Sequence, residues 1–525
     1  MCDLRGMAGK LRSGGAQSVV ASIACWALIL ACAGQSRAQG QTAPQLQGVY
    51  AHVDLEFAIN EYFRQNGGVT PAPCPPPGTP DLHAYLQNIY TGLLKNTAVA
   101  GLALGAHWCL IGTTGDGVND WSYTDEAFAA AAAANKNVQL LITPGVDSPS
   151  WLFLVGQSCD PVIKAESPNP EYQYCDWVTF KTLPESVQHH DSMTLPLPFS
   201  PIYAGRWKAF LEELKSQYAG NSLYSSAFVS ISVAEPVSVS PEMILPTTAN
   251  NSKFKDKPML PVDTGWEYLV DTIFPSTLPG SPGQYYGIWG QAFIDAWEHV
   301  FVDYESNFSG LTLILTPDDG KNMPELQYGT GNPTTLLGTD CSLDTVEGPL
   351  SCGTKAIVLT DFVAAQGPNQ KAAMVGGFTA SSEPKTGDIG LPAIKALTLI
   401  PISPQSPRFL GGAQFDYAVS TDDEKTTQKE GCKRKGCNVN LTPPQAAYNV
   451  LANFFSGTIA AGNYGTSSPP PYAALNFLNI DYRDILYAND HPCMEDLITQ
   501  ASRDLLATAG KAQFQPSTPE SCWLQ

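Results

Sequence analysis

The chain has 525 residues, of which 43% are apolar, 10% aromatic and 15% charged. This composition is too apolar and aromatic for a disordered protein, and the chain is long enough to bury a sizeable core. The 49 acidic residues outnumber the 29 basic ones, which gives a formal net charge of −20. Because such a charge repels phosphate backbones and anionic lipids, nucleic acids and membrane surfaces are disfavoured as partners.

The first 38 residues have the layout of a secretory signal peptide. Three basic residues precede an uncharged run from Ser18 to Ala33, and Ser36-Arg37-Ala38 has small residues at the −3 and −1 positions of a cleavage site. The run of about 16 residues is short for a membrane span. We therefore predict cleavage near Ala38 and a secreted, periplasmic or cell-surface protein without a membrane span. Lipid anchoring at Cys32 is the less favoured alternative.

Cysteine usage agrees with export. Ten of the thirteen cysteines lie beyond the predicted leader, and an even number in an exported chain indicates disulfide bonds. The absence of CxxC pairs and of histidine–cysteine clusters disfavours a zinc site. Pairing neighbours in the sequence suggests, without fixing the connectivity, Cys74–Cys109, Cys159–Cys175, Cys341–Cys352, Cys432–Cys437 and Cys493–Cys522.

Apolar runs of strand length alternate with segments of helical period along the chain. Alternating β and α elements predict right-handed βαβ units and a parallel sheet, and eight such units are the number that closes a (β/α)8 TIM barrel. The missing GxGxxG and GxxxxGK[ST] motifs disfavour the main alternative, a doubly wound nucleotide-binding sheet. The expected strands are 48–53, 99–108, 138–143, 227–233, 311–315, 372–378, 412–419 and 474–480, and the expected helices are 82–94, 127–134, 203–218, 289–301, 355–365, 391–397, 442–455 and 494–507.

The fold class predicted for the mature chain is therefore α/β. Residues 39–525 are expected to form a single (β/α)8 barrel domain whose long βα loops are stapled by disulfides. The segments near 155–200, 240–285 and 316–350 are expected to be loop insertions, because no linker or internal repeat separates a second domain.

The first candidate catalytic residues follow the fourth expected strand. Catalytic groups of such barrels lie at the C-terminal ends of the strands and in the loops beyond them. Ala234-Glu235-Pro236 stands directly after this strand, and Glu242 lies seven residues beyond Glu235. A carboxylic acid in apolar surroundings has a raised pKa and can protonate a leaving oxygen. Either Glu is therefore a candidate acid/base, and for each the alternative is a solvated loop carboxylate.

Two stretches resemble a large clan of (β/α)8-barrel glycoside hydrolases. The run from Trp121 to Ile142 resembles the clan's second and third β/α units, and Ala234-Glu235-Pro236 is similar to its Asn-Glu-Pro element at the end of strand four. The resemblance implies that Glu235 is the acid/base and that a nucleophilic Glu ends strand seven. Ala234 stands where the clan has an Asn that contacts the sugar 2-hydroxyl, so Glu242 stays open as the acid.

A glycosidase also needs a second carboxylate. It lies about 5–5.5 Å from the first in retaining enzymes and about 6.5–9.5 Å away in inverting ones. The seventh expected strand carries Asp416 and no Glu, whereas Glu383 follows the sixth strand. Asp481, at the end of the eighth, is a third candidate. Each of these acids has the alternative of a structural, hydrogen-bonded role.

Aromatic and histidine side chains near the strand ends suit a sugar ligand. Trp151 and Trp177 follow the third expected strand, and exposed aromatic faces stack on the CH faces of carbohydrates. His52, His107 and Trp108 stand at the ends of the first two strands, where they could hydrogen-bond a bound ring. The alternative for each is ordinary packing at the barrel rim.

The sequence thus predicts a secreted glycoside hydrolase that cleaves an oligo- or polysaccharide with a carboxylate pair. It predicts no cofactor and no metal. The alternative is a non-catalytic, exported carbohydrate-binding barrel, and the absence of a GxSxG motif argues against a serine hydrolase. The sugar, its linkage and the oligomeric state stay open.

Overall fold

The computed structural model describes residues that all lie within Leu46–Gln525. The predicted leader lies outside the described part, and so do Glu242, Glu383 and Asp416. The described residues are 46–68, 80–113, 115–158, 176–180, 193–197, 200–235, 285–316, 371–378, 409–415, 418, 448, 451–452 and 475–506.

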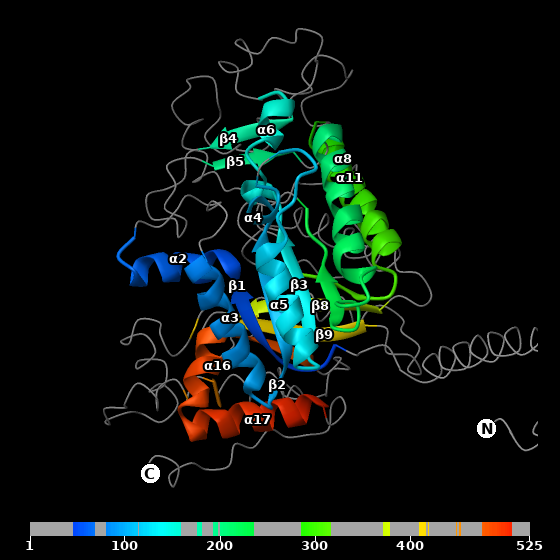
Figure 1. Ribbon diagram of the computed structural model, residues 1–525. Helices are drawn as coiled ribbons and strands as arrows, with labels where there is room; N and C mark the ends of the chain where they lie inside the picture. Colours follow the sequence, from blue (N-terminus) through cyan, green and yellow to red (C-terminus); the bar gives the residue numbers. More distant parts are fainter. Residues whose placement is uncertain are drawn as a thin grey trace, which may run out of the picture. The chain divides into compact units, whose positions relative to one another are not determined.

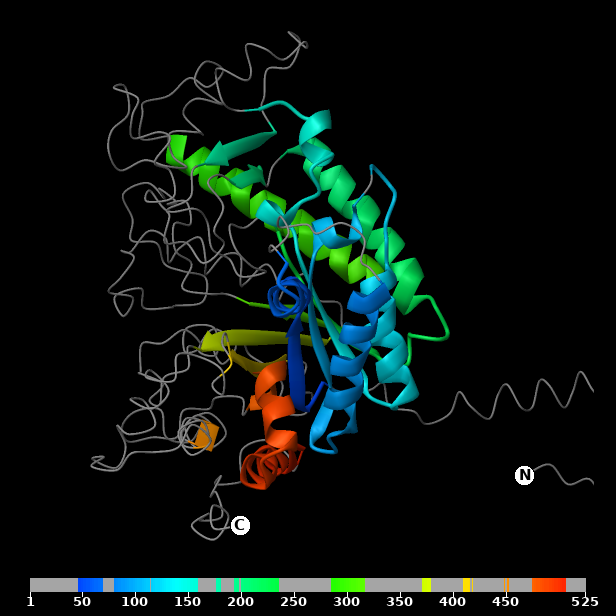
Figure 2. The same cartoon turned by 60° about the vertical axis from the view of Figure 1, so that its left-hand side comes forward.

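Eight parallel strands form one curled sheet (Figures 1 and 2). Their order is β1-β10-β9-β8-β7-β6-β3-β2, and β1 pairs with both β10 and β2, so the pairing closes on itself. The predicted α/β class with a parallel sheet is therefore confirmed. The strands are β1 (Gly48–Asp54), β2 (Val99–His107), β3 (Asn137–Thr143), β6 (Phe228–Ser232), β7 (Thr312–Leu315), β8 (Lys371–Phe378), β9 (Phe409–Phe415) and β10 (Leu475–Asp481).

Helices pack on the outside of this sheet. Figure 2 shows α3 and α5 along β2, and α8 and α11 lie side by side in both views. Among the described helices, none has the length and apolar character needed to cross a lipid bilayer. The helices are α2 (Leu55–Gln65), α3 (Pro80–Lys95), α4 (Trp108–Ile111), α5 (Ser122–Ala133), α6 (Leu152–Val155), α8 (Pro201–Leu214), α11 (Tyr285–Asn307), α16 (Tyr482–Asn489) and α17 (Pro492–Leu506), with a 3-10 turn η1 (Gly145–Asp147) and a π turn η2 (Lys215–Ala219).

Sequence features explain where these helices begin and which face they bury. The Ser200 side chain accepts a hydrogen bond from the Tyr203 backbone N–H, and Pro201 occupies the first turn of α8, so cap and proline start the helix together. In α3 the buried residues recur at the three- and four-residue spacing of one helix face.

Two apolar clusters make up the core. The larger one fills the space between the strands and the surrounding helices. The smaller one joins side chains from six different strands, which can meet only on the concave side of the sheet: Tyr50, Ala103, Leu141, Val229, Ile314 and Phe477, with Leu46 beside them. Gly412 makes room for this inner cluster, since a Cβ there would overlap the Phe477 ring. The interior of the curled sheet is thus packed with side chains.

Some elements differ from the sequence-based expectation. The helices α2 and α16 follow β1 and β10 without a loop and were not predicted. The strand β9 begins at Phe409, before the expected position 412. Within the expected loop 155–200, β4 (Trp177–Phe180) and β5 (Met193–Pro196) form a two-stranded antiparallel sheet, because both segments satisfy their backbone groups by pairing with each other.

Candidate active site

Polar side chains gather at the edge where the parallel strands end. β1 carries His52 and ends at Asp54, β2 ends at His107, and β10 ends at Asp481. In register, His52 lies opposite Asp481. Since parallel strands end at the same edge of a sheet, the predicted residues His52, His107 and Asp481 come from three neighbouring strands of one edge.

His107 contacts two carboxylates that follow the neighbouring strands. Its Nδ1 lies 2.6 Å from Oε2 of Glu56, on α2, and 3.3 Å from Oδ1 of Asp147, on η1. The side chains of His107 and Asp147 are 10% and 4% exposed. These three residues, called here the Glu56–His107–Asp147 triad, join the ends of β1, β2 and β3.

Burial and charge act in opposite directions on protonation within the triad. Burial disfavours the charged imidazolium, but the negative charges of Asp147 and Glu56 outweigh this effect and raise the pKa of His107 well above its ordinary value. Burial also raises the pKa of Asp147, and the charge of His107 opposes that rise. When protonated, the imidazolium neutralises part of the negative charge that the two carboxylates bring together.

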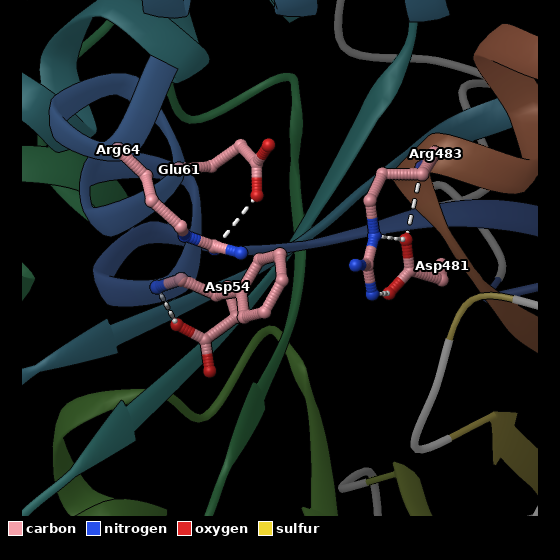
Figure 3. Close-up of polar contacts among 6 residues, drawn as sticks. Asp54, Glu61, Arg64, Asp481 and Arg483 are labelled. Atoms are coloured by element: carbon pink, nitrogen blue, oxygen red, sulfur yellow. Dashed lines mark hydrogen bonds and ion pairs between the residues drawn. The ribbon is translucent and has the colours of Figure 1, made fainter. Parts of the chain in front are cut away.

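Asp481 is held by Arg483 (Figure 3). Nε of Arg483 donates to Oδ1 of Asp481 at 2.9 Å, and Nη2 donates to Oδ2 at 2.8 Å. The Arg483 guanidinium carbon also lies 4.2 Å from the centre of the Phe57 ring. The two-pronged hydrogen bonding fixes the orientation of the carboxylate and compensates its charge.

His52 lies against the backbone of β2. A Cβ built at Gly105 would lie 3.6 Å from Nε2 of His52. Burial lowers the pKa of His52, while the negative charges of Asp54 and Asp481 oppose the decrease. A neutral imidazole has one donor and one acceptor nitrogen, which suits hydrogen bonding to a hydroxyl-rich ligand.

Glu235 follows β6, the fourth of the eight strands in chain order, and is 2% exposed. Burial raises the pKa of its carboxyl well above the ordinary value, and the negative charge of Asp303 adds to the increase. Burial also raises the pKa values of Tyr203 and Tyr304, and the Glu235 charge contributes to both. Within the described part of the chain, Oε2 of Glu235 has no hydrogen-bond partner. These surroundings favour the protonated carboxyl.

The three predicted tryptophans lie in different surroundings. Trp108 begins α4, is 1% exposed and packs edge-on against Trp151 and Trp207. Trp151 is half-buried and donates its Nε1 hydrogen to the Gly112 carbonyl at 2.8 Å. Trp177 begins β4 and is also half-buried. Trp108 is thus a core residue in this structure, whereas Trp151 and Trp177 keep part of their surface exposed.

Of the four predicted catalytic acids, the structure describes Glu235. Glu242, Glu383 and Asp416 lie outside the described residues, so their roles stay predictions. Asp481, predicted as a further acid, ends β10 as described above.

Sequence reasoning missed Glu56 and Asp147 as partners of His107. Glu56 lies two residues beyond β1, and Asp147 lies four residues beyond β3. Acidic residues directly after buried strands are the signal that points to this edge of a parallel sheet. Sequence reasoning also missed Arg483, which stands two residues after the end of β10.

Comparisons with known proteins leave the family open. No family model matches the chain, and no curated protein matches it. Among solved structures, the chain is similar to the catalytic domain of a beta-amylase from Paenibacillus polymyxa, with 12% identity over 71% of this chain and 86% of that chain. The TM-score is 0.37. A likeness this weak carries no argument about activity.

Proposed function

We propose that the protein is a secreted glycoside hydrolase with a (β/α)8-barrel architecture, acting on an oligo- or polysaccharide. The observation that carries the proposal is the state of Glu235. Glu235 lies three residues beyond the end of β6, the fourth strand, and is 2% exposed. Burial raises the pKa of its carboxyl well above the ordinary value. A carboxyl with a raised pKa is the group that glycosidases use to protonate the leaving oxygen.

The second carboxylate of the proposed reaction must be held in a fixed position beside the sugar. Asp481 meets this requirement among the described acids, because Arg483 binds both of its oxygens. Its role is to stabilise positive charge at the anomeric carbon, as nucleophile or as base. The sequence-based candidates Glu383 and Asp416 remain the alternatives for this role.

Substrate recognition is assigned to the edge around these acids. His52, whose pKa burial lowers, suits hydrogen bonding to sugar hydroxyls. Trp151 and Trp177 retain exposed surface that suits stacking on sugar rings. The predicted leader and the ten remaining cysteines support export as part of the same proposal.

The test is hydrolysis of a panel of oligosaccharides and aryl glycosides by the mature chain, with Glu235→Gln beside it. We expect Glu235→Gln to lose at least about 100-fold in kcat/KM on natural linkages, since general acid catalysis contributes about 10²–10⁴-fold. On dinitrophenyl glycosides, whose leaving group needs no proton, the variant should retain most of its activity. Glu298→Gln, which neutralises an exposed carboxyl on α11, is the matched control.

The outcomes separate the enzyme from its alternative. Equal losses on natural and activated substrates would deny Glu235 the role of acid. Binding of sugars without turnover of any substrate would instead favour the non-catalytic carbohydrate-binding barrel, in which the buried Glu235 has a structural role.

A further inference from the structure

Three consecutive strands each deliver one potential metal ligand to the same place. Glu56 follows β1, His107 ends β2 and Asp147 follows β3. One ligand atom from each residue can be chosen so that all three lie within 4.8 Å of one another. Among the residues that the structure describes, no other three His, Cys, Asp or Glu side chains come together with this spacing.

The contacts within the triad are short, yet within the described part of the chain two of its buried polar atoms have no assigned hydrogen-bond partner. Although Nδ1 of His107 lies 2.6 Å and 3.3 Å from the two carboxylates, it is a buried nitrogen without a hydrogen-bond partner among the described residues. Oδ2 of Asp147, a residue only 3% exposed, is likewise unpartnered there. Burial of such groups without hydrogen bonds is costly, and a cation between them would remove the cost.

A second histidine–carboxylate pair shows what an ordinary ion pair looks like in this fold. Nδ1 of His83 lies 2.7 Å from Oε1 of Glu126, and this contact has hydrogen-bond geometry. Both side chains are partly exposed, at 26% and 19%. The Glu56–His107–Asp147 triad differs by its second carboxylate, by the deeper burial of His107 and Asp147, and by the unpartnered ring nitrogen of its histidine.

We propose that the Glu56–His107–Asp147 triad binds a divalent transition-metal ion of the Zn²⁺ or Mn²⁺ type. One imidazole nitrogen and two carboxylate oxygens are ligands that these ions accept, with an open position left for water or a substrate oxygen. The two carboxylates balance the charge of the ion when His107 is neutral. Ca²⁺ and Mg²⁺, which prefer all-oxygen surroundings, should bind more weakly. This inference does not depend on the proposed glycosidase activity.

The test is calorimetric titration of the chelator-treated mature chain with Zn²⁺ and Mn²⁺, with Ca²⁺ and Mg²⁺ as comparison ions. We expect one Zn²⁺ or Mn²⁺ per chain at this site and a rise in Tm on binding. Glu56→Gln and His107→Gln should weaken metal binding by more than about 100-fold. Mutating residues that only hydrogen-bond to a metal ligand already lowers metal affinity by about 10–100-fold. His83→Gln is the matched control and should bind as tightly as the wild type.

Two measurements on Glu56→Gln distinguish a folding defect from the loss of a metal ligand. Glu56 is the most exposed triad member, with a 20% exposed side chain, so Glu56→Gln should still fold. The Tm of its metal-free form measures the loss of the contact with His107 separately from the loss of metal binding. Bound Co²⁺ gives visible absorption bands that report its ligands, and these bands should change in Glu56→Gln. Unchanged affinity and unchanged bands in Glu56→Gln would overturn the proposal, as would the absence of binding of all four ions to the wild type.

Discussion

Two acids near the ends of the strands, Asp481 and Glu235, have opposite surroundings. Beside β10, the carboxylate of Asp481 is bound by the guanidinium of Arg483. Beside β6, Glu235 stands among tyrosines and the like-charged Asp303, and its second oxygen has no partner in the described part. One region compensates negative charge, and the other suppresses it.

This difference is what acid/base chemistry requires. Two carboxyl groups with equal surroundings titrate together and cannot act as acid and base at one pH. Here, Arg483 binds both carboxylate oxygens of Asp481, whereas burial raises the pKa of Glu235 well above its ordinary value. The sequence presents both as an acidic residue at the end of a strand, and the surroundings alone separate them.

The largest effect should come from removing the compensating cation. Arg483→Ala leaves the Asp481 carboxylate, 11% exposed, without its partner, and we expect the free energy of unfolding to fall by about 3 kcal/mol. Arg483→Lys keeps the charge but loses the two-pronged geometry, so its loss should be smaller. Chemical denaturation measures both.

The control for this prediction lies on α2. Arg64 pairs with Glu61 at 2.7 Å, but its side chain is 60% exposed (Figure 3). Arg64→Ala should change the free energy of unfolding by less than about 0.5 kcal/mol. Equal losses in Arg64→Ala and Arg483→Ala would mean that burial does not distinguish the two pairs.

The uncompensated region should reveal itself in the pH dependence of stability. A raised folded-state pKa means that native Glu235 holds a proton that the unfolded chain has released. The free energy of unfolding is therefore unaffected by Glu235 below the pKa that this group has in the unfolded chain. It falls as the pH rises from there toward the pKa of Glu235 in the folded chain. In that window one such group lowers the free energy of unfolding by about 1.4 kcal/mol per pH unit.

The measurement is a series of denaturation curves from pH 4 upward for the wild type and Glu235→Gln. The variant should lack this decline, because an amide does not titrate, whereas Glu298→Gln should keep it. Parallel curves for the wild type and Glu235→Gln would show that the pKa of Glu235 is the same in the folded and the unfolded chain, and would contradict its raised folded-state pKa.

Much of the fold could be predicted from the sequence, because apolar runs report burial directly. Both ends of each of the first three strands lie within one residue of the expected bounds. The positions of the side chains in the site were harder to predict, because the sequence does not show in which direction the chain turns after each strand. Trp108 was expected at the rim, yet the chain enters α4 directly after His107 and turns the indole into the core. Such turns also determine which acidic side chain lies next to a cation, as Asp481 lies next to Arg483.

The smallest predicted effect concerns the helix that carries Glu56 and Phe57. Asp54 caps α2 by accepting a hydrogen bond from the Phe57 backbone N–H at 3.0 Å, so Asp54→Ala should cost about 1 kcal/mol of the free energy of unfolding. Asp54→Asn retains a capping oxygen without the charge and should cost less. A full loss in Asp54→Asn would show that the charge of Asp54 matters more than its cap. That result would extend the charge-compensated region to the end of β1, where Asp54 acts on His52.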